Sequence, residues 1–288
     1  MEANALLGGQ GVSRGWPFCP PDMGRQGLKG DGSVGWGRLW GGRSYDLGKM
    51  TLPELWVAYL TYPAIQLYFA LMAGCALLAA IFYQGAGGVL LGVMAAILIY
   101  PFVWYGIHRF ILHGRWLYRM RWTARLWKRV HFDHHQDPHR LEVLFGDPLN
   151  TIPTMAVITV PVGAWLGGMA GAVSALGGAL MMTCVYEFFH CIQHLNYKPK
   201  SRILQYMKRV HLLHHFHDES GNYGIINFLP DMLAGTYYRD TRARPRSPHV
   251  FNLGYDVEEA RRYPWVMQAT GTPPRDRPLP ASALAKRV

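Results

Sequence analysis

Two long stretches of the chain contain no Asp, Glu, Lys, Arg or His. The first lies between Glu54 and His108, and the second runs from Pro148 to Tyr186. A helix needs about 20 apolar residues to cross a bilayer, so each stretch is long enough for two crossings, the second more tightly. Core helices of soluble proteins are the alternative, but these usually keep one solvated face. The two stretches therefore predict an integral membrane protein.

Glycine-rich turns near residues 85–88 and 167–171 divide each stretch into two segments. We expect four transmembrane helices in two hairpins: 55–83, 89–105, 151–166 and 172–195. Pro63 is expected to kink the first helix. The second continues without a helix breaker through His108 and His113. Residues 115–135 suit an interfacial helix, and residues 200–217 a further helix outside the membrane. The predicted fold class is all-α, with a cytoplasmic helical cap beneath the four spans.

Positive residues flank the apolar stretches, and the chain has a net charge of +11. Seven of them and no acidic residue lie between Val103 and Phe132: Arg109, Arg115, Arg119, Arg121, Arg125, Lys128 and Arg129. Five more follow the second stretch: Lys198, Lys200, Arg202, Lys208 and Arg209. The positive-inside rule then predicts that both termini and both basic segments are cytoplasmic. We expect contact with anionic lipid head groups and no nucleic acid. The expected location is a bacterial inner membrane rather than the endoplasmic reticulum.

The ends of the chain differ in composition from its middle. Residues 1–49 contain 13 glycines and no helical periodicity, so we expect a disordered extension there. Residues 50–245 form the predicted catalytic domain, and residues 246–288 a tail rich in proline and arginine. We expect no cleavable signal peptide, because the first apolar run begins only around Leu55. The four cysteines form no CxxC pair and predict no disulfide framework.

Ten of the 13 histidines fall into four clusters. The clusters are HxxxxH (His108, His113), HxxHH (His131, His134, His135), HxxxH (His190, His194) and a second HxxHH (His211, His214, His215). At about 100° per residue, each HxxHH cluster spans an arc of roughly 100°, and the HxxxH pair about 40°. The HxxxxH pair is about 140° apart, which suits two neighbouring ions better than one. Each cluster lies at or just beyond the expected cytoplasmic end of a span. We therefore predict that all four meet near the membrane surface.

Neutral imidazole is a common ligand of iron, zinc and copper. Ten imidazoles give two ions about five nitrogens each, which leaves a position for O2 or water on an octahedral count. A lone zinc ion needs only three or four ligands. A single HxxHH cluster can arise by chance, but four clusters in under 110 residues favour metal binding. Nearby carboxylates either orient the far nitrogens of these rings or are solvated loop charges: Asp133, Asp137, Asp147, Glu187, Asp218 and Glu219. His139, His217 and His249 are expected to lie outside the ligand set.

At these clusters the sequence resembles the fatty acid hydroxylase superfamily, which includes sterol desaturases and fatty acid 2-hydroxylases. The resemblance covers roughly residues 50–240, including the segments Gly221-Asn-Tyr-Gly-Ile225 and Gly235-Thr-Tyr-Tyr238. It implies a dinuclear centre with ten histidine ligands under four membrane helices. Carried over by motif, one ion takes His108, His131, His134, His194 and His211. The other takes His113, His135, His190, His214 and His215.

Two departures from the family pattern affect the expectations. Pro230 precedes Asp231 where the family often has Trp, so the local lid is expected to differ. The His-Pro-Gly-Gly motif of a fused b-type cytochrome is missing from residues 1–49. We therefore expect electrons from a separate protein, either a b-type cytochrome or a ferredoxin with its reductase.

The function expected from this resemblance is O2-dependent hydroxylation of a fatty acyl or sphingolipid chain at a di-iron centre. A membrane lipid is the substrate and O2 the co-substrate. Two iron ions are expected, because the chemistry requires a redox metal, although a purified sample can contain zinc. The alternative is a desaturase or a sterol or carotenoid oxidase on the same centre. A zinc hydrolase or metal carrier fits less well, because GxSxG and HExxH motifs are missing and the spans lack titratable residues.

Overall fold

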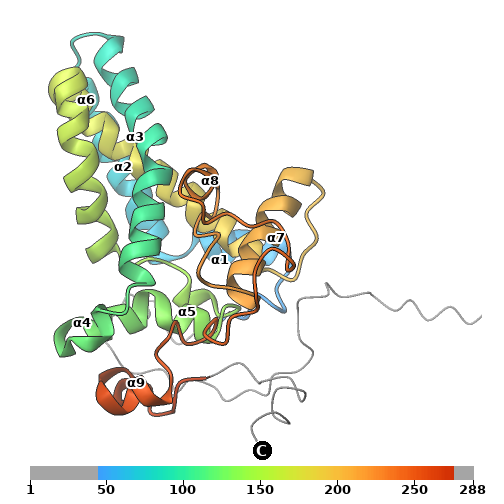
Figure 1. The fold of residues 1–288 in the computed structure, drawn as a ribbon. Helices are drawn as coiled ribbons and strands as arrows, with labels where there is room; N and C mark the ends of the chain where they lie inside the picture. Colours follow the sequence, from blue (N-terminus) through green and yellow to red (C-terminus); the bar gives the residue numbers. More distant parts are fainter. Residues whose placement is uncertain (1–44, 276–288) are drawn as a thin grey trace, which may run out of the picture.

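The computed structural model describes residues 45–275, and the predicted extension over 1–44 and the end of the predicted tail over 276–288 lie outside the described residues. The described part is mostly helical, and its only β-type pairing is an isolated bridge between Asp46 and Arg140. Three long helices, α2 (Pro63–Ile81), α3 (Ala86–Gly106) and α6 (Pro148–His194), form an elongated bundle (Figure 1). The helix α6 packs against both α2 and α3.

The bundle contains both predicted turns. Gly85 precedes α3 with a φ of 132°, which favours glycine, and Gly168 interrupts α6 with a φ of 61°. A Cβ atom added to Gly163 would lie 2.4 Å from the carbonyl oxygen of Gly171, so α6 folds back on itself at the interruption. Its two arms, 148–166 and 169–194, therefore match the third and fourth predicted helices and form an antiparallel pair (Figure 1).

The first predicted helix is interrupted at its proline. The helix α1 (Leu52–Leu60) ends before Thr61, and α2 begins at Pro63. Proline lacks a backbone N–H and suits the first turn of a helix, which explains the break. Within residues 45–275, three segments are long and apolar enough to cross a membrane, Pro63–Ile81, Ala86–Arg119 and Leu141–His194, the last of which contains the reversal in α6. These segments fit an integral membrane location.

Shorter elements gather at one end of the bundle. The predicted helix over 115–135 is instead a series of pieces: η3 (Leu117–Arg119, a 3-10 turn), α4 (Arg121–Trp127), η4 (Lys128–Phe132, a π-helix) and α5 (Asp133–Gln136). A π-helix, η2 (Ile107–Leu112), extends α3 as predicted. The 3-10 turn η5 (Leu141–Val143), α7 (Arg202–Phe216) and α8 (Leu229–Leu233) complete this end. The helix α7 confirms that residues 200–217 contain a helix.

The packed structure extends beyond both limits set for the predicted catalytic domain. Leu47 is fully buried, and its backbone N–H donates to the carbonyl of His139. On the other side, α9 (Val257–Arg262) and α10 (Trp265–Thr270) place Val266 in a core with Trp127 of α4. Much of the segment that we expected to be a proline- and arginine-rich tail, as far as residue 275, therefore belongs to the packed structure. Proline and arginine content suggested a tail, but Val250, Tyr255 and Val266 are all fully buried.

The described cysteines agree with the prediction of no disulfide framework. Cys75, Cys184 and Cys191 are free and buried among apolar side chains. They behave as small packing residues.

Candidate metal centre

Four chain segments bring the ten predicted histidines together at the end of the bundle. The π-helix η2 carries His108 and ends at His113. The η4–α5 segment, the last turns of α6 and the helix α7 supply the others: His131, His134 and His135, then His190 and His194, then His211, His214 and His215. The predicted convergence is therefore present in the structure.

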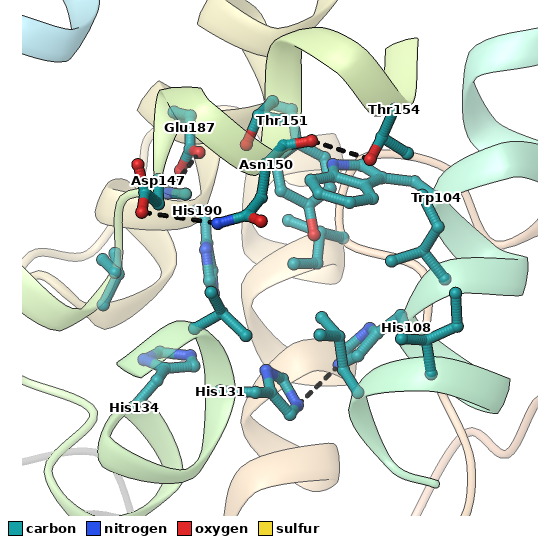
Figure 2. A pocket seen from close by; sticks show the side chains of 18 of the residues that line it. Trp104, His108, His131, His134, Asp147, Asn150, Thr151, Thr154, Glu187 and His190 are labelled. Atoms are coloured by element: carbon teal, nitrogen blue, oxygen red, sulfur yellow. Dashed lines mark hydrogen bonds between the residues drawn. The ribbon is translucent and has the colours of Figure 1, made fainter. Parts of the chain in front are cut away.

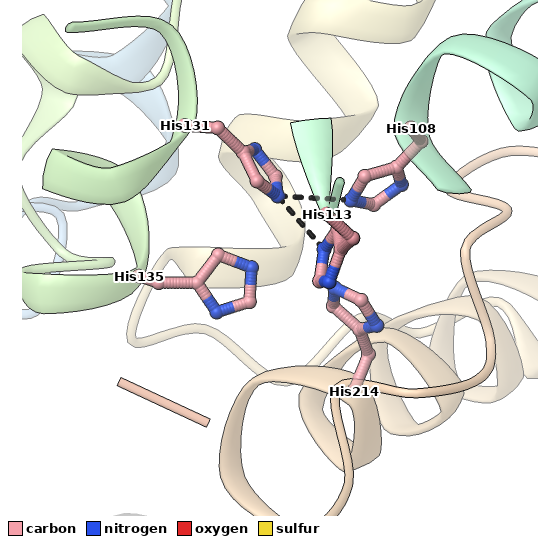
Figure 3. A group of neighbouring side chains, drawn as sticks. All are labelled: His108, His113, His131, His135 and His214. Carbon is pink, nitrogen blue, oxygen red and sulfur yellow. Dashed lines mark hydrogen bonds between the residues drawn. The ribbon is translucent and has the colours of Figure 1, made fainter. Parts of the chain in front are cut away.

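The ten rings form two groups of five. In each group, one ring nitrogen from every histidine lies within 4.8 Å of those from the other four. The first, which we call the His108 group, contains His108, His113, His131, His135 and His214 (Figure 3). The second, the His134 group, contains His134, His190, His194, His211 and His215. His139, His217 and His249 belong to neither group.

The spacing of the nitrogens suits an octahedral ion. In the His108 group, Nε2 of His131 lies 3.2 Å from Nε2 of His108 and 2.9 Å from Nε2 of His113. In the His134 group, the Nε2 atoms of His134 and His215 are 3.0 Å apart, and those of His194 and His211 are 2.9 Å apart. Adjacent octahedral positions at a metal–nitrogen distance of about 2.1 Å are about 3.0 Å apart. The corresponding tetrahedral separation is about 3.4 Å, which is longer than any of these four.

Burial keeps these imidazoles neutral, which is the form that binds metals. Nine of the ten are buried, and His113 is half-buried. Burial lowers the pKa of His135 to about 3. It also holds the pKa values of His211 and His214 well below their usual range, and neighbouring histidines lower them further. The protein can therefore keep ten nitrogens available as ligands near neutral pH.

Backbone carbonyls orient three rings of the His108 group. Nδ1 of His108 donates to the carbonyl oxygen of Tyr223, and Nδ1 of His214 to that of Gly221, at 2.8 Å. In His135, Nδ1 donates to the carbonyl oxygen of Val250 at 2.7 Å. A carbonyl can only accept, so each ring carries its proton on Nδ1 and leaves Nε2 free for a metal. In His135 and His214 that Nε2 is buried and has no other hydrogen-bond partner among the described residues.

The carboxylates near the clusters make other contacts. Asp133 forms an ion pair with Lys128 at 2.8 Å, and Asp218 one with Arg244 at 3.2 Å. Glu187 accepts from the backbone N–H of Gly146 at 2.9 Å. Orientation of the rings by backbone carbonyls was not predicted, because the sequence does not indicate which loops return to the site.

The division of the histidines between two ions differs from the one implied by the family resemblance. That division separated His108 from His113, whereas the structure places their ring centroids 4.9 Å apart in one group. The backbone explains the difference. Between these residues the helix is a π-helix, and the N–H of His113 donates to the carbonyl of His108 at 3.0 Å. In a π-helix residues five apart lie on the same face, so an angle based on α-helical geometry was wrong here.

A simple rule describes the remaining members of the groups. Residues four apart on a helix share a face, and His131 with His135 both belong to the His108 group. Two further pairs with this spacing also stay together, because His190 with His194 and His211 with His215 both belong to the His134 group. The middle histidine of each HxxHH cluster, His134 or His214, belongs to the opposite group. Each HxxHH cluster therefore contributes to both groups.

A cavity of about 220 Å³ lies against both groups. It touches six of the histidines: His108, His131, His134, His190, His211 and His215. Much of its remaining lining is apolar, including Trp104, Ile107, Leu126, Val130 and Leu144. Figure 2 shows His108, His131 and His134 on one side of this space and Asp147, Asn150 and Thr154 across it.

On the polar side of the cavity, the sequence indicated Asp147 and Glu187 but not Asn150, Thr151 or Thr154. Asn150 donates to the carboxylate of Asp147 at 3.3 Å, and the Thr154 hydroxyl donates to the carbonyl of Asn150 at 2.7 Å. One signal was available in the sequence, because Glu187 precedes His190 by three residues and so shares its helical face. For Asn150 and Thr154 no comparable signal existed, since their position depends on how α6 folds back.

Comparison with known proteins supports the reading of the site. The family profile described as "Fatty acid hydroxylase" matches residues 93–236, which include all ten histidines. The chain is 29% identical over 147 residues to dihydroceramide fatty acyl 2-hydroxylase FAH2 of Arabidopsis thaliana, covering 50% of this chain and 59% of that protein. It is 28% identical over 134 residues to fatty acid 2-hydroxylase of Mus musculus, covering 46% of this chain and 36% of that one. The match thus spans little more than half of the plant relative.

A solved structure shares the fold. The structure described as "Full length scs7p (only hydroxylase domain visible)" superposes with a TM-score of 0.52 and 21% sequence identity, covering 70% of this chain and 71% of that one. The family match spans half of the chain and contains the complete histidine constellation. The chain therefore belongs to the fatty acid hydroxylase family.

Proposed function

We propose that this protein hydroxylates a C–H bond of a membrane lipid chain, using O2 and two iron ions held by the His108 and His134 groups. The observation that carries the proposal is the juxtaposition of two five-histidine groups with a mainly apolar cavity. When bound, a pair of redox metal ions supplies the activation of O2 and the oxidation of the C–H bond. Imidazole accepts both iron and zinc, but zinc has no redox chemistry, so we assign iron.

The residues of the chain then have distinct tasks. The ten imidazoles hold the ions, and the carbonyls of Tyr223, Gly221 and Val250 fix the proton on the far side of three rings. Trp104, Ile107 and other apolar side chains bind the lipid chain and exclude water from the reacting carbon.

The polar side of the cavity suits a neutral head-group portion of the substrate. Asp147, Asn150, Thr151, Thr154 and Glu187 offer several acceptors, two of them carboxylates, and no cation. An amide or hydroxyl of an acyl-lipid can donate to these oxygens, whereas a free carboxylate would meet like charge. The plant relative is a dihydroceramide fatty acyl 2-hydroxylase by its name, which agrees with this preference. We prefer hydroxylation over desaturation because this relative is a hydroxylase by its name.

We further propose four membrane crossings, made by α2, α3 and the two arms of α6. Large apolar side chains on these helices are exposed, among them Leu77, Leu90, Leu98, Val157 and Trp165, as expected for contact with lipid. Basic residues around η2 and α4 orient the histidines and both termini toward the cytoplasm by the positive-inside rule. Electrons come from a separate donor, a b-type cytochrome or a ferredoxin with its reductase, and the membrane is a bacterial inner membrane.

Lipid analysis of cells with and without the gene tests the function. A chain-hydroxylated lipid is expected to disappear on deletion and to return with the wild-type gene. It should not return with His135→Ala, which removes one nitrogen from the His108 group. The matched control is His217→Gln, because His217 belongs to neither group and its Nε2 donates to the backbone carbonyl of Arg244 at 2.9 Å. This variant should restore the lipid.

The product mass separates hydroxylation from desaturation. Hydroxylation adds one oxygen atom to the lipid, whereas desaturation removes two hydrogen atoms. A product that lacks two hydrogens would replace the proposed hydroxylation with desaturation on the same centre. An unchanged lipid profile in the deletion strain would contradict both.

A further inference from the structure

We infer that the two metal sites are inequivalent, and that the His108 group binds its ion at least ten-fold more tightly than the His134 group. This inference rests on the metal centre proposed above and concerns its assembly rather than its reaction. The observation behind it is an unequal distribution of hydrogen bonds from the Nδ1 atoms of the two groups to backbone carbonyls. Three rings of the His108 group have backbone acceptors for these atoms.

The His134 group has no corresponding acceptors among residues 45–275. Nε2 atoms converge in two of its pairs, His134 with His215 and His194 with His211. The Nδ1 atoms of those four rings are buried and have no hydrogen-bond partner within the described part of the chain. His190 completes the group. Both of its ring nitrogens are also buried and have no hydrogen-bond partner among the described residues.

The difference affects the tautomer that each ring must adopt to bind a metal. A neutral imidazole carries one proton, and a ring that binds through Nε2 must hold that proton on Nδ1. The three carbonyls of the His108 group impose this tautomer before metal arrives. In the His134 group no backbone carbonyl of the described residues accepts from Nδ1, so nothing there selects this tautomer. A ring of that group that binds metal through Nε2 must keep its proton on a buried Nδ1 without an acceptor among those residues.

Loss of such an outer partner typically lowers metal affinity 10- to 100-fold. Three partners in one group and none in the other therefore predict a substantial difference between the two ions. The His108 group is expected to bind its ion more tightly, because the oriented rings belong to that group.

A buried carboxylate strengthens the support of the His108 group. Asp231 is fully buried, and its two oxygens accept from the backbone N–H groups of Tyr223 at 2.8 Å and Gly224 at 2.7 Å. The hydroxyl of Thr236 donates to it at 2.7 Å. These contacts fix the turn whose Tyr223 carbonyl orients His108. Asp231 is thus a positioning residue for the His108 group, although it touches no ring itself.

Titration of the metal-free, full-length protein with Co(II) against a competing chelator tests the inference. We expect two binding steps whose dissociation constants differ at least ten-fold, each with its own visible absorption band. Two variants on the same helix, α7, assign the steps. His214→Ala should remove the tight step and His211→Ala the weak one, because the two residues belong to different groups. Asp231→Asn should weaken the tight step 10- to 100-fold and leave the weak step unchanged.

A second measurement does not depend on the variants. Wild-type protein loaded with one equivalent of Co(II) should show anomalous scattering in the His108 group. Two steps of equal affinity, or cobalt in the His134 group at one equivalent, would overturn the inference and leave the proposed hydroxylation intact. Absence of any bound cobalt would overturn the metal centre itself. Conversely, unequal sites in a protein whose deletion changes no lipid would support this inference and contradict the proposed reaction.

Discussion

The helical bundle exposes large apolar side chains, whereas the histidine end of the molecule buries polar ones. In the bundle, Leu77 and Leu98 are exposed by 65% and 64%, and the helices approach one another through glycines. At the histidine end, polar side chains are buried instead, including Asp231, His135 and His214, each fully buried. The bundle therefore depends on close backbone packing, whereas the histidine end depends on satisfied hydrogen bonds and ion pairs.

This difference predicts different sensitivities to substitution. Apolar side chains that contact lipid tails in both the folded and the separated helices contribute little to helix association. Removing the partner of a buried polar group costs more free energy of folding than the intact pair contributed. The histidine end should therefore respond to loss of single polar contacts, and the bundle to loss of close packing.

The largest effect is expected at the buried ion pair between Lys128 and Asp133. Its atoms are 2.8 Å apart, and both side chains are about one-tenth exposed, at 11% and 10%. Lys128→Met keeps the aliphatic stem but leaves the Asp133 carboxylate buried without its cation. Removal of one partner of such a pair costs about 3–5 kcal/mol. Chemical or thermal unfolding of the purified protein measures the change.

Two controls show whether the unpaired charge is responsible. Arg262→Met breaks an exposed pair with Glu258, whose side chains are 62% and 70% exposed, and should cost about 0–1 kcal/mol. Adding Asp133→Asn to Lys128→Met removes the stranded charge and should recover much of the loss. Equal effects for Lys128→Met and Arg262→Met would show that the histidine end does not depend on this pair.

A smaller effect is expected within the bundle, where two leucines provide a direct contrast. Leu180 is 1% exposed, so Leu180→Ala should lower the free energy of unfolding by about 2–5 kcal/mol through the cavity it leaves. Leu77→Ala, at a side chain 65% exposed, should change it by less than about 0.5 kcal/mol, because surrounding lipid or detergent fills the space. Similar losses for both would argue that Leu77 faces another protein surface rather than lipid.

The sequence predicted the long elements well because their signals are local. Uncharged length located the apolar helices, and the glycines at residues 85 and 168 adopt the backbone angles that reverse the chain. Pro63 marked the break between α1 and α2. The histidine clusters likewise identified all ten members of the two groups, since their spacing repeats along the chain.

Features that depend on distant segments or unusual backbone were not predictable in the same way. The π-helical geometry between His108 and His113 has no evident sequence signal, so the division of ligands was misjudged. The carbonyls of Gly221, Tyr223 and Val250 reach the rings only because the chain after α7 returns to the site. The burial of Val266 against α4 likewise depends on a distant segment, and composition alone does not indicate it.

The smallest effect, but a change of sign, is expected for alanine at two glycines of the bundle. A Cβ atom on Gly92 of α3 would lie 2.3 Å from the carbonyl oxygen of Gly171 in α6, whereas one on Gly74 of α2 meets nothing within 4 Å. Alanine favours a helix over glycine by about 1 kcal/mol. Gly74→Ala should therefore leave stability unchanged or raise it slightly.

Gly92→Ala should instead lower stability by about 1–3 kcal/mol, because α3 and α6 must separate to admit the methyl group. Thermal unfolding in one detergent compares the two variants, and the retained metal content reports whether the histidine end follows the bundle. A loss of stability with both metals retained would indicate that the two regions are stabilised independently. If Gly92→Ala and Gly74→Ala unfolded at the same temperature, close contact between α3 and α6 would not hold the bundle together.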